Sequence, residues 1–336
     1  MQFNALAALS AKAPLTPYSF DPGPLAPGEV QIKLTHCGIC HSDVHLIDND
    51  WGISQYPLVP GHEAVGVVEE VGAGVRTLKP GQRVGVGWQA GACHHCEWCV
   101  SGQDNLCAQN QATCVGHAGG FADRLRVSEG YAFPVPEALP SGSVGPLLCG
   151  GITVFSPLRH LGILPTHRIG VVGIGGLGHL ALRFTRAWGC EVTAFTSSPD
   201  KETEARGFGA HHVVSSVDAA AMAARTGTLD FIISTVNADL DWPAYINLLR
   251  PNGTLCFVGV PPSPLTISAF PLIAAQRAIA GSVIGGRAAI REMLDFAARH
   301  GITAQTEEMP LARANEALDR VRRNQARYRM VLRIPS

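Results

Sequence analysis

The chain has 336 residues, of which 46% are hydrophobic and 16% charged, so one hydrophobic core is too small for it and disorder is not expected. Its 26 Lys and Arg residues nearly balance its 27 Asp and Glu residues. This balance argues against nucleic acid or an anionic membrane as the main partner, because both require a concentrated basic surface.

The N-terminal stretch MQFNALAALSAKAP has no basic segment ahead of its short apolar run, so it does not resemble a signal peptide. The chain also lacks the run of about eighteen apolar residues that a membrane span requires. We therefore expect a cytoplasmic protein. In a reducing compartment its 10 cysteines would be thiols or metal ligands rather than disulfides.

Residues 1–149 are rich in Gly and Pro, and short β-type runs such as VQIKLTHC, EAVGVVEEVG and RVGVGW alternate with turn signals. This pattern predicts a small β-rich domain of barrel type. From Arg168 the sequence pattern changes. The segment RIGVVGIGGLGHLALRFTRAWGCEVTAF indicates a strand, a glycine-rich turn, a helix and a second strand. Strands HVVSS, FIISTV and TLCFVGV follow, and helices are expected near 201–208, 218–225 and 243–250.

Alternating strands and helices of this kind predict a doubly wound parallel sheet. Beyond it we expect two amphipathic helices, AAIREMLDFAARHG and ARANEALDRVRRN, and a closing strand, RYRMVLRI. The fold class is therefore α/β plus β. Its expected domains are a β-rich catalytic domain (1–149), an inserted dinucleotide-binding domain (150–286) and a C-terminal return to the first domain (287–336).

Four cysteines follow the pattern C-x2-C-x2-C-x7-C: Cys93, Cys96, Cys99 and Cys107. Four thiolates at this spacing can surround zinc tetrahedrally at about 2.3 Å per sulfur and leave no open position. We therefore predict a structural zinc site in this loop. The alternative, four buried small residues without a metal, fits poorly with a turn-rich stretch. His94 and His95 are expected at the surface.

A second group of possible metal ligands is spread along the chain: Cys40, His62, Glu63 and Cys149. A catalytic zinc needs three protein ligands and an open position for water or substrate. Spacing alone does not join these residues, and Cys37 competes with Cys40, because C-G-I-C can itself chelate a metal. A hydrogen-bonded histidine and a core cysteine remain alternative interpretations.

The strand IGVV runs into a turn with the spacing G-x-G-x-x-G that opens a helix. Its residues are Gly173, Gly175, Gly176, Leu177 and Gly178. Such glycines let a pyrophosphate approach the N–H groups at the helix N-terminus. A simple packing turn is the alternative, but the strand before it and the helix after it favour dinucleotide binding.

The end of the second strand indicates which dinucleotide is bound. NAD-specific sites place Asp or Glu there to bind the ribose 2′-hydroxyl. Here the strand runs out into Ser197 and Ser198, followed by Lys201. Hydroxyl donors and a cation suit a phosphate dianion, so we predict NADP(H). An ordinary serine-rich turn is the alternative.

Together these motifs resemble the zinc-containing medium-chain dehydrogenase/reductase superfamily. Within it they are most similar to the cinnamyl-alcohol-dehydrogenase branch and its bacterial NADPH-dependent aldehyde reductases. The matching segments span nearly the whole chain and include CGICHSDVH, WGISQYPLVPGHE, LLCGGITVFSPL, VVGIGGLGHLA, STVNADLDW and RYRMVL. The resemblance implies a GroES-like catalytic domain with an inserted Rossmann domain and two zinc ions per chain. It also implies hydride transfer between NADP(H) and small aldehydes or primary alcohols.

The resemblance assigns the ligands of a catalytic zinc as Cys40, His62 and Cys149. It leaves Cys37 as a packing residue. Glu63 matches an acid that can approach the metal when water leaves, and Asp43 matches a residue that orients the histidine ligand.

Further roles follow from the same resemblance. Ser42 would contact the substrate oxygen, and His45 would pass the proton to solvent. Thr153 would pack on the nicotinamide. The residues that match 2′-phosphate contacts are Ser197, Ser198 and Lys201. The residues that match the substrate pocket, each of which could equally be ordinary core packing, are Trp51, Ile53, Trp88 and Ile284.

One segment departs from the family. The chain between Cys107 and GGFAD is shorter than in many relatives and carries an additional Cys114. Two other functions compete with a zinc dehydrogenase. A zinc-free NADPH:quinone or enone reductase would not need the three dispersed ligands, and a zinc-ribbon binding module would need a basic face. The apolar region VPPSPLTISAFPLI and the resemblance together suggest a homodimer.

Overall fold

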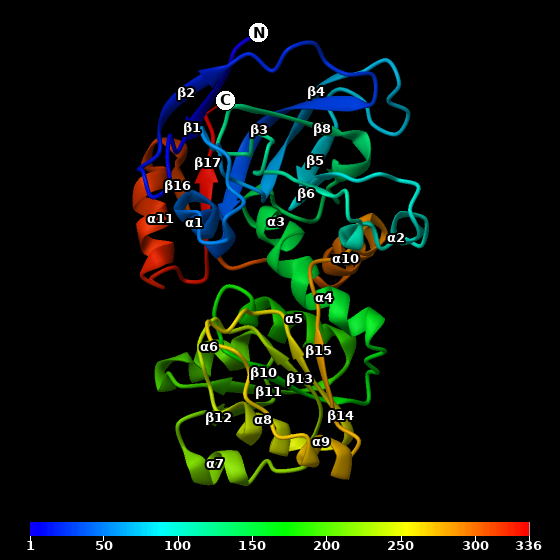
Figure 1. Ribbon diagram of the computed structural model, residues 1–336, viewed down its shortest axis with the longest axis vertical. Coiled ribbons are helices and arrows are strands. Elements are labelled where there is room, and N and C mark those ends of the chain that lie inside the picture. Colours follow the sequence, from blue (N-terminus) through cyan, green and yellow to red (C-terminus); the bar gives the residue numbers. More distant parts are fainter. Residues whose placement is uncertain (336) are drawn as a thin grey trace. The chain divides into compact units, whose positions relative to one another are not determined.

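The computed structural model describes residues 1–335, which form two compact units (Figure 1). One unit consists of Met1–Ile152 together with the chain from Gly285 onward, and the other of Thr153–Ile284. Within residues 1–335 no single helix is both long and apolar enough to cross a membrane. Only the helix pair Ser141–Leu148 and Gly150–His160, bent by 50°, reaches that length and composition together.

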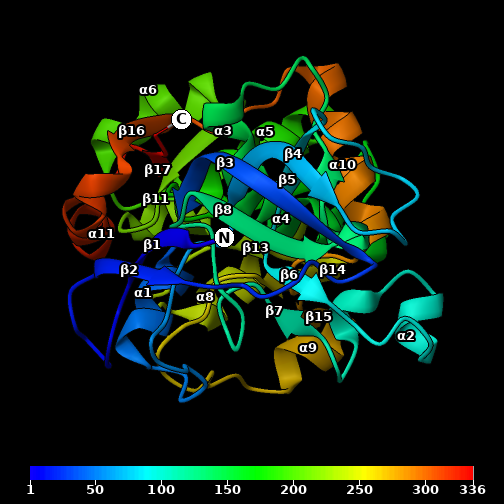
Figure 2. The same cartoon turned by 90° about the horizontal axis from the view of Figure 1, so that it is seen from above.

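The first unit is built around a β-sheet in the order β16-β17-β3-β4-β5-β9, with β8 paired to β3. Figure 2 shows β3 lying across this unit with β4, β5 and β8 beside it. Its strands are β1 (Phe3–Ala7), β2 (Thr16–Phe20), β3 (Glu29–Ile39), β4 (Ala64–Val71), β5 (Arg83–Val86), β6 (Gln89–Gly91), β7 (Gln111–Ala112), β8 (Arg124–Ser128), β9 (Phe133–Pro134), β16 (Thr306–Pro310) and β17 (Arg329–Arg333). Its helices are α1 (His41–Asp48), α2 (Glu97–Val100), α3 (Ser141–Val144), α10 (Arg287–His300) and α11 (Ala314–Arg322).

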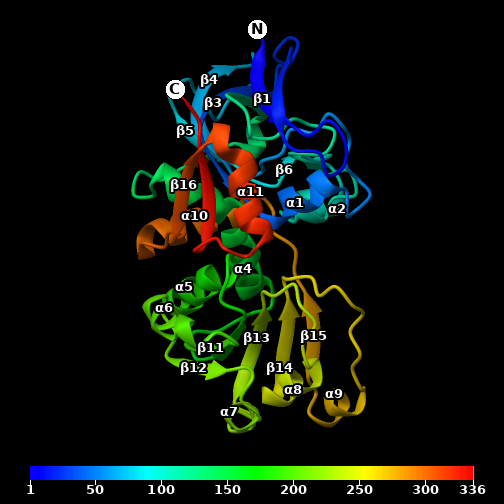
Figure 3. The ribbon, with the colours of Figure 1, turned by 90° about the vertical axis from the view of Figure 1, so that its left-hand side faces the viewer.

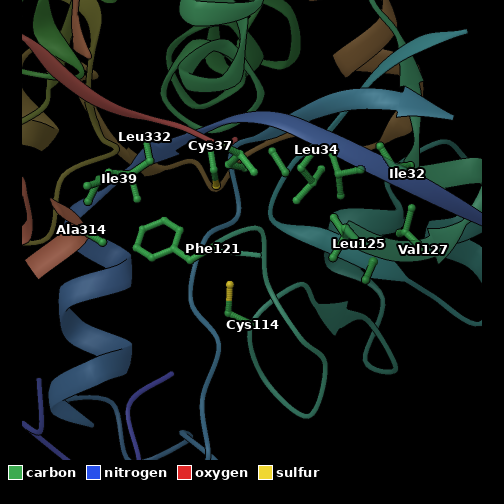
Figure 4. Packing of buried hydrophobic residues seen from close by; sticks show 14 of the residues in the cluster. Ile32, Leu34, Cys37, Ile39, Cys114, Phe121, Leu125, Val127, Ala314 and Leu332 are labelled. Atoms are coloured by element: carbon green, nitrogen blue, oxygen red, sulfur yellow. The ribbon is translucent and has the colours of Figure 1, made fainter. Parts of the chain in front are cut away.

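The core of this unit lies against one face of β3. Alternating side chains of that strand are buried, and Ile32, Leu34 and Cys37 are at most 1% exposed. Figure 4 shows them directed into a cluster that also contains Phe121 and Cys114. Val30, Ile32 and Leu34 lie on one face because a β-strand sends alternate side chains to opposite faces. A register shift between Leu34 and His36 returns Cys37 to that face, and the strand ends just before Cys40.

The second unit contains six parallel strands in the order β12-β11-β10-β13-β14-β15. Figure 3 shows β13, β14 and β15 running side by side. The strands are β10 (Arg168–Val172), β11 (Glu191–Thr196), β12 (His212–Ser215), β13 (Leu229–Ser234), β14 (Leu249–Phe257) and β15 (Ala278–Gly281). The helices are α5 (Gly178–Trp188), α6 (Glu202–Gly207), α7 (Ala219–Ala223), α8 (Trp242–Leu248) and α9 (Phe270–Ala274), and α4 (Gly150–His160) runs into this unit from the first. The order reverses at β10, as expected for a doubly wound sheet.

Several elements differ from the sequence prediction, among them helix α4 and strand β15, which were not predicted. The helix expected near 243–250 ends at Leu248, and Leu249 is extended and pairs with Leu229 of β13. Pro251 explains this early end, because proline disfavours helical geometry in the residue before it. Helix α1 was not predicted at all, although it begins directly at the CGICHSD motif.

Candidate functional site

The first functional group lies where strand β3 ends and helix α1 begins. Cys40 is the N-cap residue of α1, and its backbone N–H donates to Asp43 Oδ2 at 2.8 Å. A carboxylate at this third helical position stabilises the free N–H groups of the first turn. The local sequence therefore fixes the direction of the Cys40 thiol by means of helix capping.

Two distant segments bring further potential metal ligands to this thiol. His62 Nε2 lies 3.3 Å from Cys149 Sγ, and Cys149 Sγ lies 3.9 Å from Cys40 Sγ. One ligand atom each of Cys40, His62, Cys149 and Glu63 lie within 4.8 Å of one another. The structure thus joins the three residues that spacing alone could not connect. Cys37, the competing thiol, is fully buried in the hydrophobic core instead.

Asp43 determines which nitrogen of His62 faces the two sulfurs. Its Oδ1 accepts from the backbone N–H of Gly61 at 2.9 Å and lies 3.0 Å from His62 Nδ1. Asp43 and His62 are both completely buried. Because the carboxylate binds Nδ1, the other ring nitrogen, Nε2, faces Cys149.

The thiols of Cys40 and Cys149 interact strongly with each other. The hydrogen bond from Cys149 lowers the pKa of the Cys40 thiol well below its ordinary value, and the same contact raises that of Cys149. Burial alone would lower the pKa of His62, but Asp43 and Cys149 raise it well above its ordinary value. The lowered pKa favours the thiolate form of Cys40, which is the form that binds a metal ion.

Glu63 completes the group from the side of the sheet. Burial raises the pKa of its carboxyl to about 7, against the opposing charge of Arg329. Its Oε1 accepts from Arg329, whereas its buried Oε2 has no hydrogen-bond partner within the described residues. A Cβ at Gly38 would lie 2.0 Å from Oε2, so glycine is required there. This carboxylate oxygen is a further potential metal ligand beside the two sulfurs.

The donor set fits zinc. Tetrahedral zinc with sulfur ligands at about 2.3 Å places the sulfurs about 3.8 Å apart, close to the observed 3.9 Å between Cys40 and Cys149. Two sulfurs and one imidazole nitrogen leave the fourth position of a tetrahedron open. This arrangement is the one that catalytic zinc sites share.

The predicted proton-transfer residues lie on helix α1, which begins at this group. Ser42 Oγ is 3.6 Å from Cys40 Sγ. His45, on the same helix, has Nδ1 2.8 Å from the Asp50 carboxylate, and its ring centroid lies 5.2 Å from that of Trp51. Both His45 and Asp50 are partly exposed, so this end of the helix reaches solvent.

Aromatic rings connect this surface to the buried histidine. Trp51 packs edge-on against Trp88 at 6.1 Å between centroids, and Trp88 packs edge-on against His62 at 5.0 Å. Trp51 and Ile53 are 45% and 47% exposed, whereas Trp88 is half-buried. The first unit therefore contains three of the four predicted pocket residues. Ile284 is half-buried at the end of the second unit.

The four clustered cysteines also come together. Cys93, Cys96, Cys99 and Cys107 place their sulfurs within 4.8 Å of one another, and Cys93 Sγ lies 3.8 Å from Cys99 Sγ. N–H groups of His95 and Cys96 lower the pKa of Cys93 to about 6, while burial raises that of Cys99 to about 12. The sulfur spacing equals the ~3.8 Å of a tetrahedral zinc–thiolate site. His94 and His95 are exposed.

The glycine-rich turn lies between β10 and α5. Gly173 has a φ of +84°, and a Cβ at Gly178 would lie 1.9 Å from the Gly173 carbonyl oxygen. Gly175 has no atom within 4 Å of its Cβ position, so the turn is open on one side. Gly176 and Leu177 follow, and Leu177 caps α5. This shape suits an anion at the helix N-terminus.

Lys201 links the tip of β11 to this turn. Its Nζ donates to the Ile174 carbonyl at 2.9 Å. Ser197 is exposed and Ser198 half-buried, directly after β11. The ammonium and both hydroxyls thus lie at the carboxyl edge of the sheet, where doubly wound folds bind nucleotides. Thr153 is buried in α4 of the same unit.

Comparison with known proteins identifies the family. The model for the alcohol dehydrogenase GroES-like domain matches residues 26–137, and that for zinc-binding dehydrogenases matches residues 176–299. An aldehyde reductase of Synechocystis is 50% identical over 329 residues, which is 98% of each protein. The chain belongs to the zinc-containing medium-chain dehydrogenase/reductase superfamily, in its cinnamyl-alcohol-dehydrogenase branch.

Solved structures of the superfamily agree. A cinnamyl alcohol dehydrogenase from Sorghum bicolor is 42% identical, has a TM-score of 0.95, and the match covers 99% of this chain and 98% of that one. An enzyme of the same type from Helicobacter pylori, solved with NADP(H), is 33% identical with a TM-score of 0.91, with coverage of 99% and 98%. These findings confirm the predicted resemblance and the predicted GroES-like and Rossmann fold classes.

Two residues of this dehydrogenase site were missed by the sequence analysis, and the position of a third was not predicted. Arg329 lies in the closing strand and carries no local signal for its ion pair with Glu63, 266 residues away. Asp50 could have been noticed, because it lies five residues after His45, at the end of the same helix. Cys114 was noticed, but nothing in its spacing indicated that its sulfur lies within 4.8 Å of a His62 nitrogen.

Proposed function

We propose that this chain is an NADP(H)-dependent zinc alcohol dehydrogenase and aldehyde reductase that acts on small aliphatic or aromatic aldehydes and the matching primary alcohols. One observation carries the proposal. Three potential ligands from distant parts of the chain, the partly buried Cys40 and the buried His62 and Cys149, converge at one point. Relatives at 40–50% identity are called aldehyde reductase, cinnamyl alcohol dehydrogenase and formaldehyde dehydrogenase.

In this proposal Cys40, His62 and Cys149 hold a catalytic zinc, and the four-cysteine loop holds a structural one. Bound zinc would act as a Lewis acid on the substrate oxygen, and a bound nicotinamide would exchange hydride with the carbonyl carbon. Asp43 keeps the His62 proton on Nδ1, so that Nε2 remains a ligand. Glu63, with its free Oε2, is the acid that stands next to the ligand set.

Proton movement is assigned to helix α1. Ser42 lies beside the Cys40 sulfur and His45 follows one turn later, where it reaches solvent. Residues three apart on a helix share a face, so the two side chains form one path. The Asp50 carboxylate binds His45 Nδ1 at 2.8 Å and leaves Nε2 to exchange the proton.

Cofactor and substrate choice rest on two further groups. We assign the 2′-phosphate to Ser197, Ser198 and Lys201, because a strand tip with hydroxyls and an ammonium attracts a dianion that a carboxylate would repel. The Helicobacter relative was solved with NADP(H), which supports the choice of cofactor. The indoles of Trp51 and Trp88 favour an apolar substrate over a polyol, and Thr153 and Ile284 are assigned to the nicotinamide and the pocket.

The competing functions find less support. A zinc-free quinone or enone reductase would leave the converging sulfurs and imidazole without a purpose. A nucleic-acid-binding zinc ribbon would need cations around the four-cysteine loop, but the charged side chains between Cys93 and Cys107 are Glu97 and Asp104. The catalytic domain in this proposal comprises residues 1–149 and 287–336, and the dinucleotide domain residues 150–286.

We further propose a homodimer in the cytoplasm. Strand β15 is the edge of the parallel sheet, and apolar side chains near it are open to solvent. Val260, Phe270 and Ile273 are 77%, 75% and 73% exposed. An uncovered edge strand beside apolar side chains invites pairing with a second copy. Phe270→Glu is expected to convert a dimer into monomers in light scattering. The cytoplasm is proposed because closely spaced cysteines that bind metal are typical of a reducing compartment.

The direct test measures NADPH oxidation against a panel of aliphatic, aromatic and α-hydroxy aldehydes. We expect turnover of simple aldehydes, a clear preference for NADPH over NADH, and loss of activity after treatment with a zinc chelator. Activity only with quinones or enones would contradict the proposal. Equal kcat/KM for NADPH and NADH would contradict the assignment of Ser197, Ser198 and Lys201.

A further inference from the structure

Cys114 is a thiol that the proposed function leaves without a role. It is 2% exposed, and its sulfur lies within 4.8 Å of a His62 nitrogen and an Asp43 carboxylate oxygen. His62 turns Nε2 toward Cys149 and Nδ1 toward Asp43. Cys114 therefore belongs to the outer edge of the histidine, with Asp43, and not to the proposed ligand set.

The backbone before Cys114 is firmly held. The N–H of Thr113 donates to the Trp88 carbonyl at 2.8 Å, and its hydroxyl lies 2.6 Å from the Gly87 carbonyl oxygen. Thr113 is fully buried. These bonds fix the direction in which the next side chain leaves the backbone, so the thiol has little freedom to move away from His62.

Thr113 also holds a second neighbour of His62, the residue Trp88. Trp88, to which Thr113 is bonded, packs edge-on against His62 at an interplanar angle of 82°. The imidazole thus has Asp43 at Nδ1, the indole at its ring and the thiol at its outer edge. Thr113 holds Trp88 and Cys114 supplies the thiol, so these two consecutive residues account for two of the three contacts.

Solvent approaches Cys114 from its other side. A cavity of about 350 Å³ includes Cys114 in its wall, together with Tyr56 and His117. On the inner side lie the fully buried Asp43 and His62. Figure 4 shows the Cys114 sulfur on its loop beside Phe121, facing strand β3. The side chain therefore separates a water-accessible cavity from the hydrogen bond that orients the histidine.

We propose that Cys114 is a positioning residue of the catalytic metal site, whose thiol closes the outer edge of His62 and keeps water away from the Asp43–His62 hydrogen bond. The inference rests on the proposed function, in which His62 binds zinc. Water that reached this hydrogen bond would compete for the Asp43 carboxylate and loosen the imidazole. Contacts of this kind control how tightly a histidine ligand holds its metal.

The test follows zinc release from the intact enzyme to a coloured chelator. The wild type is expected to show two phases, and the phase that Cys40→Ser lacks belongs to the catalytic zinc. Cys114→Ala should accelerate that phase about tenfold, as is typical when a contact behind a ligand is removed. Cys114→Ser, which retains most of the volume and a donor, should restore slow release. The other phase, from the four-cysteine loop, should not change and reports an intact fold.

Cys37→Ala is the matched control, because it removes a thiol that is equally buried in the same core cluster but hydrogen-bonds its own segment. A catalytic phase in Cys114→Ala within about twofold of the wild type would overturn the inference, since removal of a contact behind a ligand normally has a larger effect. Equal acceleration in Cys37→Ala would overturn it too. A wild type with one zinc and one phase, or without aldehyde reduction, would instead contradict the proposed function itself.

Discussion

The two groups of metal-binding side chains differ in how the chain brings their donors together. The four-cysteine loop closes within fifteen residues, from Cys93 to Cys107. The other group takes Cys40 from the end of β3, His62 from the loop before β4 and Cys149 from the segment before α4. Short closure costs little chain entropy, whereas the dispersed group depends on the whole fold of its unit. The local group consists of four sulfurs, and the dispersed one of two sulfurs, an imidazole nitrogen and a nearby carboxylate oxygen.

The largest expected effect comes from the dispersed group. Cys149→Ala removes one of three proposed ligands, so activity should fall about a thousandfold or more, equivalent to ~4 kcal/mol of transition-state stabilisation. The circular dichroism spectrum and the zinc of the four-cysteine loop should remain. Substantial aldehyde reduction by this variant would show that Cys149 does not hold the reactive metal.

The local group should show the reverse behaviour. Cys99→Ser opens the four-cysteine site, and loss of its metal should lower the free energy of unfolding by about 3–5 kcal/mol. Urea unfolding measures this loss, while activity at low temperature should persist because the dispersed ligands are intact. If activity vanished in protein that is still folded, the loop would have a direct part in catalysis.

Asp43→Asn should have an intermediate effect. The Asp43 carboxylate now accepts hydrogen bonds from three N–H groups, and an amide would turn its own N–H₂ group toward at least one of them. His62 would therefore lose its fixed orientation. Replacement of such a partner lowers metal affinity or activity about 10–100-fold. Zinc titration and kcat/KM check this together. Unchanged values for both would mean that His62 is oriented without Asp43.

Cofactor preference should respond least. Ser197→Asp places a carboxylate where the 2′-phosphate is expected, and the ratio of kcat/KM for NADPH to that for NADH should fall about tenfold, or ~1.4 kcal/mol. Thr226→Asp adds the same charge at an exposed turn of the same unit and serves as the control. A ratio unaffected by Ser197→Asp would remove this strand tip from cofactor recognition.

Much of the fold could be predicted from the sequence because its signals are local. The glycine turn, the alternating strands and the four-cysteine spacing each occupy one short segment, and the parallel order β12-β11-β10-β13-β14-β15 follows from them. Helix α1 was missed because its eight residues carry a capping carboxylate, Asp43, that was interpreted only through its metal role. The end of α8 was placed too late because the effect of Pro251 was not considered.

The dispersed site could be predicted only by resemblance. Spacing left Cys37 and Cys40 as equal candidates, and burial of Cys37 in the core separates them in the structure. The residues that contact these ligands from behind were even harder to predict from the sequence. Arg329 reaches Glu63 across 266 positions, and Cys114 reaches His62 through a loop held by Thr113. Such contacts depend on packing between segments, for which one sequence contains no periodic signal.

The central claim is that one chain holds two zinc ions with separate tasks, and elemental analysis of the wild type and Cys40→Ser tests it most directly. We predict about two zinc ions per chain in the wild type. In Cys40→Ser we predict about one, held by the four-cysteine loop in folded protein without aldehyde reductase activity. One zinc in both proteins, or an active Cys40→Ser enzyme, would contradict the account.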